Sequence, residues 1–176
     1  LSCFSSQNDL KRYIDELYAR QRFKALKRVC QLALDDPNYP ALSPYIQWLL
    51  AKTQVRYYDY KNGIPALHRV RKNKALTQSQ HDEAIFFLAK AYIKTNQIKK
   101  ALSYLKYLAN RSTEFQKQAL YELCWYYKKR QIRPSFRYYD RRFKTLFSDT
   151  ETYNAYAWEM AWYNLGKRAK YLRNTI

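Results

Sequence analysis

The sequence predicts an all-α protein, a solenoid of about five helical hairpins. Ile64, Ile98, Ile132 and Gly166 stand 34 residues apart, and each opens a similar short segment. A fixed period of this length is typical of helix-turn-helix repeat arrays, in which one unit cannot bury its apolar face alone. The chain also has only 2 glycines in 176 residues, fewer than a β-rich protein or a nucleotide-binding loop would need.

The first hairpin is expected over residues 8–34. Leu10, Ile14 and Leu17 recur there at the spacing of a buried helical stripe. A second helix follows over about 22–34, and the Asp- and Pro-containing segment after it cannot readily continue a helix.

The second hairpin is expected over residues 43–72. Its first helix should begin at Ser43 and reach about Lys61, where Asn62 and Gly63 end it, because both residue types accept the left-handed C-cap conformation. A shorter helix should then follow over about 64–72.

Three further hairpins complete the expected array, over 79–109, 113–147 and 151–175. Each divides into two helices, expected over about 79–95 and 97–109, 113–130 and 132–147, and 151–165 and 167–175. No stretch alternates β-branched and polar residues over four or more positions, so we expect no strand. We interpret residues 8–176 as one repeat domain, preceded by a flexible segment over 1–7.

The charge balance is strongly positive. Lys and Arg number 33 against 14 Asp and Glu, which gives a formal net charge of +19. Such a field favours an acidic partner: nucleic acid, anionic lipid, an acidic protein face or an anionic cell-wall polymer. Charge alone does not choose among these partners, and solvated helix faces of a basic protein would carry the same residues.

The cysteines and histidines do not form a metal-binding pattern. No cysteine pair has metal-ligand spacing, and His68 and His81 have no partners nearby in the sequence, so we expect no metal site. Cys30 and Cys124 fall on apolar helix faces, where a small buried hydrophobe is the default. Cys3 differs, because Leu-Ser-Cys followed by serines resembles the end of a bacterial lipoprotein signal. That resemblance implies lipidation of Cys3, and a frayed terminus is the alternative. The sequence contains no run of 18 apolar residues, so we expect no membrane-spanning segment.

Small and large residues recur at family-specific intervals in the expected hairpins. In the copy that begins near Asp82, these positions are occupied by Ile85, Leu88, Ala89, Tyr92, Ala101 and Leu105. The next two copies place there Ala119, Leu123, Tyr126, Ser135 and Tyr139, and then Ala157, Met160 and Ala169. On these residues the chain resembles the tetratricopeptide-repeat family over about 43–175. The resemblance implies a right-handed superhelix that serves as a protein-interaction scaffold.

A narrower resemblance rests on two aromatic-rich segments, 119–127 and 157–163. They resemble the superhelical, non-catalytic region of bacterial soluble lytic transglycosylases and envelope lipoproteins that work in assembly complexes. The second segment contains Trp-Glu-Met-Ala-Trp, which is more similar to the former group. This resemblance implies a bacterial protein and favours the periplasm or envelope over the cytoplasm. The catalytic half of such a transglycosylase is not in this sequence.

The sequence lacks the residue patterns of the common catalytic sites. Its paired acidic residues stand at helix starts, helix ends or polar faces, where they offset the helix dipole. No Ser, Cys or Thr nucleophile has a histidine at a plausible local spacing, and there is no glycine-rich phosphate loop. We therefore predict a non-catalytic protein with no cofactor.

The resemblance also implies a binding groove on the first helix of each pair. Carried over residue by residue, it gives Lys52 and Arg56, Phe86 and Lys90, Leu120 and Cys124, and Asn154 and Trp158. Helical spacing adds Lys117 and Lys128 to the same face. The asparagines of the family's carboxylate clamp are absent, so a clamp for a C-terminal peptide is not expected. We expect a groove that holds an acidic, partly apolar protein segment.

Two other partners stay open. Nucleic acid would suit the charge and the aromatics, although no repeated polar pair of a base-reading array is evident. The last expected helix ends the chain on an apolar face, with no polar capping helix after it. Either the chain is a piece of a longer protein, or this end pairs with a partner or with a second copy.

Overall fold

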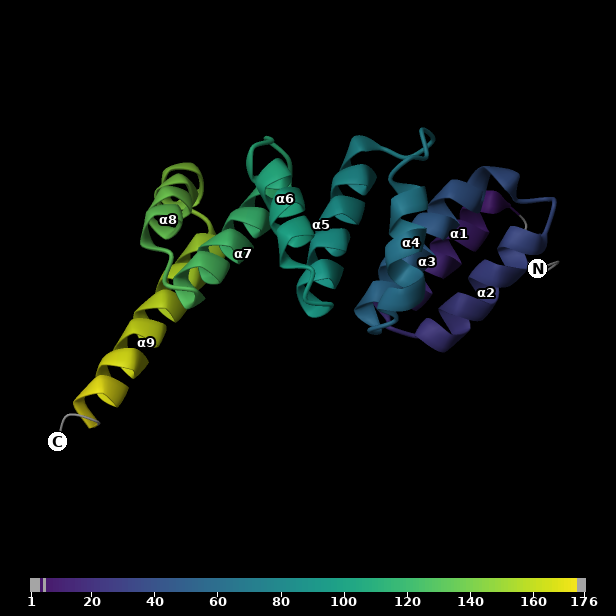
Figure 1. Cartoon of the computed structure of the whole chain (residues 1–176). Coiled ribbons are helices and arrows are strands. Elements are labelled where there is room, and N and C mark those ends of the chain that lie inside the picture. Colours follow the sequence, from purple (N-terminus) through teal and green to yellow (C-terminus); the bar gives the residue numbers. More distant parts are fainter. Residues whose placement is uncertain (1–3, 5, 174–176) are drawn as a thin grey trace. The chain divides into compact units, whose positions relative to one another are not determined.

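The protein is all-helical in the computed structural model, which describes residue 4 and residues 6–173, with side chains as far as Arg168 (Figure 1). This confirms the predicted fold class, because no strand occurs in the described part of the chain. The described helices are α1 (Gln7–Ala19), α2 (Phe23–Asp35), the 3₁₀ turn η1 (Pro40–Leu42), α3 (Ser43–Arg56), α4 (Tyr60–Val70), α5 (Gln78–Lys94), α6 (Ile98–Ala109), α7 (Gln116–Lys129), α8 (Arg133–Phe147) and α9 (Glu151–Arg173). The right-handed solenoid stays a prediction.

The chain divides into two compact units, which we describe separately. The N-terminal unit ends at Tyr104 and the C-terminal unit begins at Leu105, so the division falls within α6. Neighbouring helices pack against each other within each unit: α1, α2, α3, α4 and α5 in the first, and α7, α8 and α9 in the second. The single domain expected over 8–176 stays a prediction.

Four helical hairpins share one turn geometry. In each turn, one residue has a positive φ near 60°, and the next N–H donates to the carbonyl five residues back, as in the Schellman motif. The residues with positive φ are Gln21, Tyr58, Asn96 and Gln131. The closing bonds are Arg22 to Leu17, Asp59 to Gln54, Gln97 to Tyr92 and Ile132 to Tyr127, at 2.8–3.0 Å. A common turn in successive hairpins is what a repeat array requires locally.

The N-terminal unit has a continuous apolar core. Its fully buried side chains come from successive helices and include Leu10, Ile14, Leu26, Ile46, Leu67 and Leu88. The start of α5 is fixed by a capping box, in which Thr77 and Gln80 each accept a hydrogen bond from the other's backbone N–H. This helix carries half of the candidate site described below.

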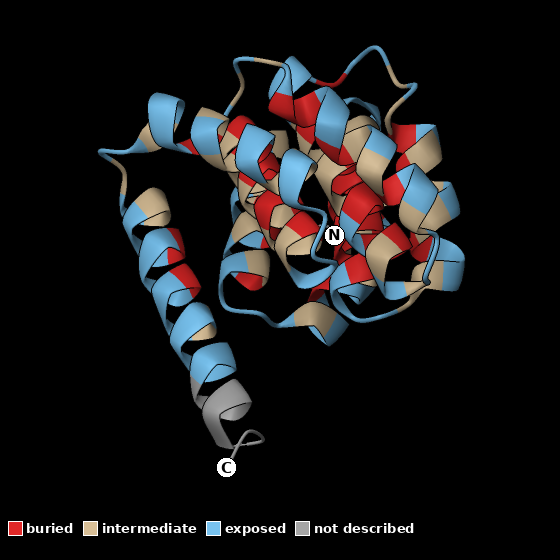
Figure 2. Cartoon of the chain, turned by 60° about the vertical axis from the view of Figure 1, so that its left-hand side comes forward, coloured by how far each residue is buried: buried red, intermediate tan, exposed pale blue. Residues whose placement is uncertain are grey.

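The C-terminal unit is centred on two aromatic side chains. Phe143 of α8 and Tyr156 of α9 are almost fully buried, and their ring centroids lie 5.0 Å apart. Two donors satisfy the carbonyl at the end of α6, because Gln116 and Arg142 both bond to Ala109 O at 3.0 Å. In Figure 2 the described part of α9 is largely pale blue, so most of this helix is exposed.

The expected break at Asn62 and Gly63 is wrong. The helix from Ser43 ends at Arg56, and α4 begins before the glycine, after Asp59 accepts a hydrogen bond from the Asn62 N–H. Gly63 lies inside α4, where a Cβ atom would stand 2.7 Å from Val55 Cγ2. The glycine therefore permits the close approach of α4 to α3 and does not end a helix.

The expected last hairpin is also wrong. Residues 151–173 form one continuous helix, α9, with no turn between 165 and 167. Gly166 lies inside this helix with a negative φ, so the 34-residue step that ends there does not mark a hairpin. The described residues thus hold four hairpins and a single last helix, where five hairpins were expected. Residues 1–3 and 5 of the expected flexible segment lie outside the described residues, and Ser6 caps α1.

Candidate functional site

Three of the expected groove residues line one pocket in the N-terminal unit. Arg56 comes from the end of α3, and Phe86 and Lys90 come from one face of α5. The pocket has a volume of about 300 Å³. Its lining consists of Val55, Arg56, Tyr58, Tyr60, Phe86, Phe87, Lys90 and Lys94. Three cations and four aromatic rings thus surround a small cavity that opens to solvent.

The aromatic side chains of this pocket are arranged edge to face. The Tyr58 and Tyr60 rings lie 6.1 Å apart at 82°, and the Phe86 and Phe87 rings lie 6.5 Å apart at 78°. The Lys90 Nζ atom lies 5.8 Å from the Phe86 ring centroid. Edge-to-face rings with a cation over one of them offer apolar contact and positive charge to the same ligand.

The fold positions this pocket at the turn between α3 and α4. Tyr58 has a φ of 63°, and its side chain is 74% exposed. The left-handed conformation turns the chain back at this point, so Tyr60 at the start of α4 follows within two residues. Arg56 is held nearby, because its Nη1 donates to the Tyr18 hydroxyl at 2.9 Å.

Lys52 lies in the interior of the N-terminal unit. Only 6% of this residue is exposed, and its Nζ atom stands 3.7 Å from the Trp48 ring centroid. The Nζ atom also pairs with the Glu83 carboxylate, with an N–O distance of 3.3 Å. Burial lowers the pKa of Lys52, and the charge of Glu83 opposes that shift. Lys52 joins α3 to α5 and does not line the pocket.

The expected groove residues of the C-terminal unit divide into buried and exposed groups. Leu120 and Cys124 on α7 are completely buried, so neither presents a surface to a partner. Burial raises the pKa of the Cys124 thiol to about 12. Asn154 and Trp158 on α9 are exposed.

The two expected groove lysines of α7, Lys117 and Lys128, are half-buried. The Lys128 Nζ atom lies 4.9 Å from the Phe136 ring centroid, and Lys117 lies eleven residues earlier on the same helix. Lys128 and Phe136 line a second cavity, of about 180 Å³, with Tyr163 and Lys167 of α9. This cavity is smaller and more polar than the pocket beside α3, so we take the latter as the candidate site.

Sequence reasoning missed five lining residues: Val55, Tyr58, Tyr60, Phe87 and Lys94. The first helix of the second hairpin was expected to reach about Lys61, but it ends at Arg56. Both tyrosines were therefore expected inside a helix. Lys94 could have been found, because it follows Lys90 by one helical turn on α5.

The structure offers no metal-binding cluster among the described residues, since no three side chains of His, Cys, Asp or Glu gather there. Cys30 is buried, as expected from its apolar face, and Cys3 lies outside the described residues. No described helix is both long enough and apolar enough to cross a membrane. Comparisons of this chain with protein-family models, with curated proteins and with solved structures found no match.

Proposed function

We propose that the protein is a non-catalytic interaction scaffold that binds an acidic, partly apolar protein segment in the pocket between α3, α4 and α5. The observation that carries this proposal is the lining of the pocket, where Arg56, Lys90 and Lys94 accompany four aromatic rings. Among the described residues that line it, none is a carboxylate.

The pocket suits this class of ligand in size and in charge. A cavity of about 300 Å³ is at the small end of ligand sites and accommodates one or two side chains. An apolar side chain would contact Phe86, Phe87 and Tyr60, while flanking carboxylates would pair with the three cations. The net charge of +19 would draw an acidic segment toward the protein before contact.

Peptide binding tests the proposal. The probe is a fluorescent peptide in which glutamates flank one phenylalanine, and its affinity is measured by anisotropy at physiological salt. Lys90→Glu combined with Lys94→Glu should weaken binding at least about tenfold, because two attractive contacts become repulsive. The matched control, Arg12→Glu with Arg28→Glu, changes the charge equally on exposed faces of α1 and α2.

Two results would count against the pocket. Equal weakening in both double variants would show that the peptide responds to net charge alone. Replacing the phenylalanine of the peptide by serine should also weaken binding several-fold, because aromatic contact area is lost. An unchanged affinity for the serine peptide would remove the apolar part of the proposal.

The proposal includes the tetratricopeptide-like array and the bacterial envelope location that the sequence resemblance implies. The four hairpins with a common turn support the former. The envelope location rests on the resemblance alone, and a fractionation of the native host would test it.

A second candidate function, nucleic-acid binding, is favoured by one face of α8. Arg133, Arg137, Arg141 and Lys144 are all exposed and fall on one stripe at spacings of four, four and three residues. The only acidic residue of α8, Asp140, accepts a hydrogen bond from Tyr156 on another face. A row of cations on one helix is suited to a phosphate backbone.

Salt dependence tests this second candidate. If the stripe binds single-stranded oligonucleotides, Arg137→Glu with Arg141→Glu should weaken the affinity and lower the slope of log affinity against log salt by roughly 1.4. The same two charge changes at Arg12 and Arg28 should leave the slope nearly unchanged. Equal slopes for both double variants would refute a site on α8.

A further inference from the structure

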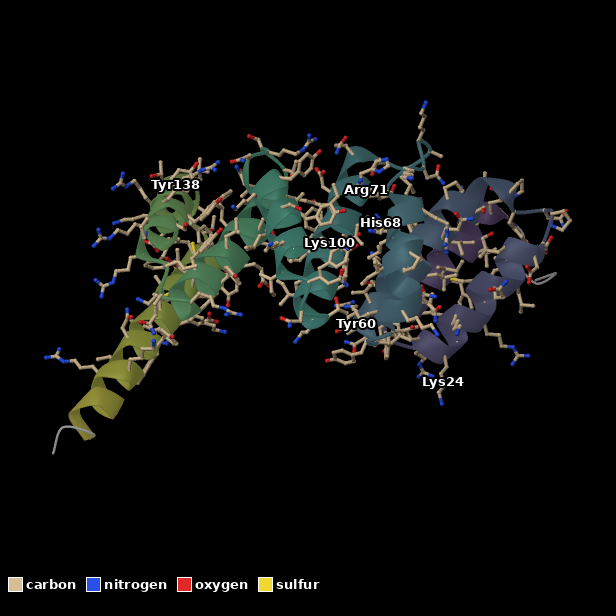
Figure 3. All side chains as sticks on the ribbon, viewed as in Figure 1. Lys24, Tyr60, His68, Arg71, Lys100 and Tyr138 are labelled. Carbon is tan, nitrogen blue, oxygen red and sulfur yellow. The ribbon has the colours of Figure 1, made fainter. Side chains whose placement is uncertain are left out.

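His68, near the C-terminal end of α4, lies among cations from two helices. Its Nε2 atom is 2.8 Å from the hydroxyl of Tyr92 on α5. Arg71, which caps α4, lies over the Tyr104 ring at 5.4 Å, and Lys100 of α6 lies over the Tyr92 ring at 5.3 Å. Figure 3 shows His68, Arg71 and Lys100 in the same region of the N-terminal unit, on α4 and α6.

Two stacked rings hold these cations in place. The Tyr92 and Tyr104 rings are nearly parallel, at 7°, with centroids 6.0 Å apart. Tyr92 is buried in the core, so the platform is fixed by packing rather than by solvent-exposed contacts. Each ring carries one cation, which limits the freedom of both long side chains before any ligand arrives.

The charges around His68 are of one sign. Arg71 and Lys72 face it from the end of α4, Lys100 faces it from α6, and the neutral Tyr92 hydroxyl faces it from α5. Burial lowers the pKa of His68, and the three cations lower it further. An anion that binds among these like charges reduces the electrostatic repulsion between them.

We propose that His68, Arg71 and Lys100 form a binding site for a tetrahedral oxyanion, a phosphate or sulfate group, either free or carried on a larger molecule. Arg71 offers a planar pair of donors, Lys100 a point charge, and protonated His68 a third donor. None of these three side chains lines the pocket of the proposed function, so the two sites can be tested independently.

The two histidines of the chain allow an internally controlled test. The pKa of His68 is measured by NMR in chloride, in sulfate and in inorganic phosphate at equal ionic strength, with the His81 resonance in the same spectra as the reference. Bound oxyanion stabilises the imidazolium, so the pKa of His68 should be higher in sulfate and phosphate than in chloride by about one unit. An equal pKa of His68 in chloride, sulfate and phosphate, or an equal change at His81, would overturn the site.

Variants locate the anion. Arg71→Gln and Lys100→Gln should each reduce the difference between phosphate and chloride by more than half, whereas Lys24→Gln on the exposed face of α2 should leave it intact. An unchanged difference in both site variants would overturn the assignment. A phosphoserine peptide that binds more tightly than inorganic phosphate would identify a group carried on a protein, and equal affinity would identify the free ion.

A different observation, the exposed face of α9, carries a second inference. Trp158, Trp162 and Leu165 are 68%, 59% and 56% exposed, and the exposed Ala155 continues the same stripe. The opposite face is the packed one, where Tyr156 and Met160 are buried. Two largely exposed indoles on one helix are far more apolar surface than a solvated helix needs.

The order of residues along this stripe is self-complementary. Ala155, Trp158, Trp162 and Leu165 have spacings of three, four and three residues, which read the same in both directions. We propose that the occupant of this face is the α9 helix of a second copy, paired antiparallel about a two-fold axis. Trp158 then faces Trp162 of the second copy, and Leu165 faces the small Ala155.

The charges of α9 favour the antiparallel orientation. Glu151 lies at its start, and Lys167 and Arg168 lie near its end. Antiparallel pairing brings the acidic start of one helix beside the basic end of the other, whereas parallel pairing brings like charges together. A single helix pair buries less area than a stable dimer needs, and each copy is strongly positive, so we expect a weak dimer with a dissociation constant on the order of 10 µM at physiological salt.

Sedimentation and cross-linking test this pairing in a Cys3→Ser background. The parent chain should shift from monomer to dimer with concentration, and Trp162→Glu should remain monomeric with an unchanged far-UV circular dichroism spectrum. A mixture of Ala155→Cys and Leu165→Cys chains should form disulfide dimers, whereas each variant alone should not. A parent chain that stays monomeric to submillimolar concentration would overturn the pairing. Cross-linking of Ala155→Cys with itself would overturn the antiparallel order.

Discussion

The two glycines of this chain lie in helices of very different surroundings. Gly63, in α4 of the N-terminal unit, stands where a Cβ atom would lie 2.7 Å from Val55 Cγ2 and 3.1 Å from the Val55 nitrogen. Gly166, in α9 of the C-terminal unit, has no heavy atom within 4 Å of such a Cβ atom. One glycine is required by packing, and the other is surrounded by open space.

The comparison shows that glycine does not mark the turns of this protein. The left-handed positions of the four hairpins carry Gln21, Tyr58, Asn96 and Gln131 instead. Gln21, Tyr58 and Gln131 each cost about 1–2 kcal/mol in that conformation, which the surrounding helix packing has to offset, whereas asparagine adopts it more readily. Close packing between helices thus stabilises the N-terminal unit. The helix α9 is stabilised mainly by its own backbone hydrogen bonds and by a few buried side chains.

The largest effect is expected for Gly63→Ala. The added methyl group would overlap Val55, a residue of α3 that is itself 5% exposed, so the two helices would have to separate. We expect a loss of about 1–3 kcal/mol in the free energy of unfolding, as for other overpacked cores, measured by urea denaturation. A double variant with Val55→Ala should recover part of the loss, because it removes the atom that the methyl group meets. An unchanged stability of Gly63→Ala would show that α4 is not closely packed on α3.

The next largest effect is expected for Tyr156, the buried tyrosine that joins α9 to α8. Tyr156 is 1% exposed, and its hydroxyl donates to Asp140 of α8. Tyr156→Phe removes this bond and should cost about 1–2 kcal/mol, because Asp140 loses its partner. The measurement is urea denaturation at neutral pH, with Tyr138→Phe on an exposed side chain as the matched control. Equal stability of the two variants would mean that α9 depends little on this contact.

The same residue predicts a dependence on alkaline pH. Burial raises the pKa of Tyr156 above its ordinary value, and the proximity of Cys124 and Asp140 adds to that rise. A raised pKa in the folded state means that the stabilisation is fully present below about pH 10 and is lost as the pH rises further. Tyr156→Phe should therefore lose less stability between pH 9 and pH 11 than the parent chain. An identical loss in both would assign the alkaline transition to other tyrosines.

Local sequence rules identified the helices and two of the turns. The expected helix boundaries left residues 96 and 131 between helices, and both have a positive φ there. Tyr58 was placed inside a helix, because tyrosine is not a residue type that favours a left-handed turn. Gly63 has the composition of a helix end, and only the packing of α4 against α3 shows why it lies inside a helix. A period in the sequence can likewise be real in part of the chain and coincidental at Gly166, which lies inside α9.

The candidate site was predictable in part from the repeat resemblance of the sequence. That resemblance implied Arg56, Phe86 and Lys90, and these three side chains line one pocket. It also implied Lys52 and Cys124, yet both are buried, because Lys52 pairs with Glu83 and contacts Trp48, and α7 packs on both α8 and α9. Burial of this kind depends on the side chains of neighbouring helices, and the residue pattern of one helix does not reveal them.

A smaller effect is expected at the turn between α7 and α8. Gln131 has a φ of 58°, and glycine reaches that conformation without steric cost. Gln131→Gly should therefore stabilise the protein by about 1 kcal/mol, measured by thermal denaturation. Gln118→Gly inside α7 is the matched control and should destabilise by a similar amount, since a helix interior disfavours glycine. A loss in both variants would mean that the turn is not left-handed in solution.

The smallest effect, and the one that separates the two interpretations of α9, is expected for Gly166→Ala. If residues 151–173 form one helix, alanine gains about 0.5–1 kcal/mol over glycine there, because it loses less backbone entropy and meets no neighbouring atom. If the chain instead turned at this glycine with a positive φ, as the 34-residue period predicts, alanine would destabilise the turn by a comparable amount. The sign of the change in unfolding free energy therefore decides between a helix and a turn. Far-UV circular dichroism of the same variant provides the check, because helix content should stay equal or rise only in the first case.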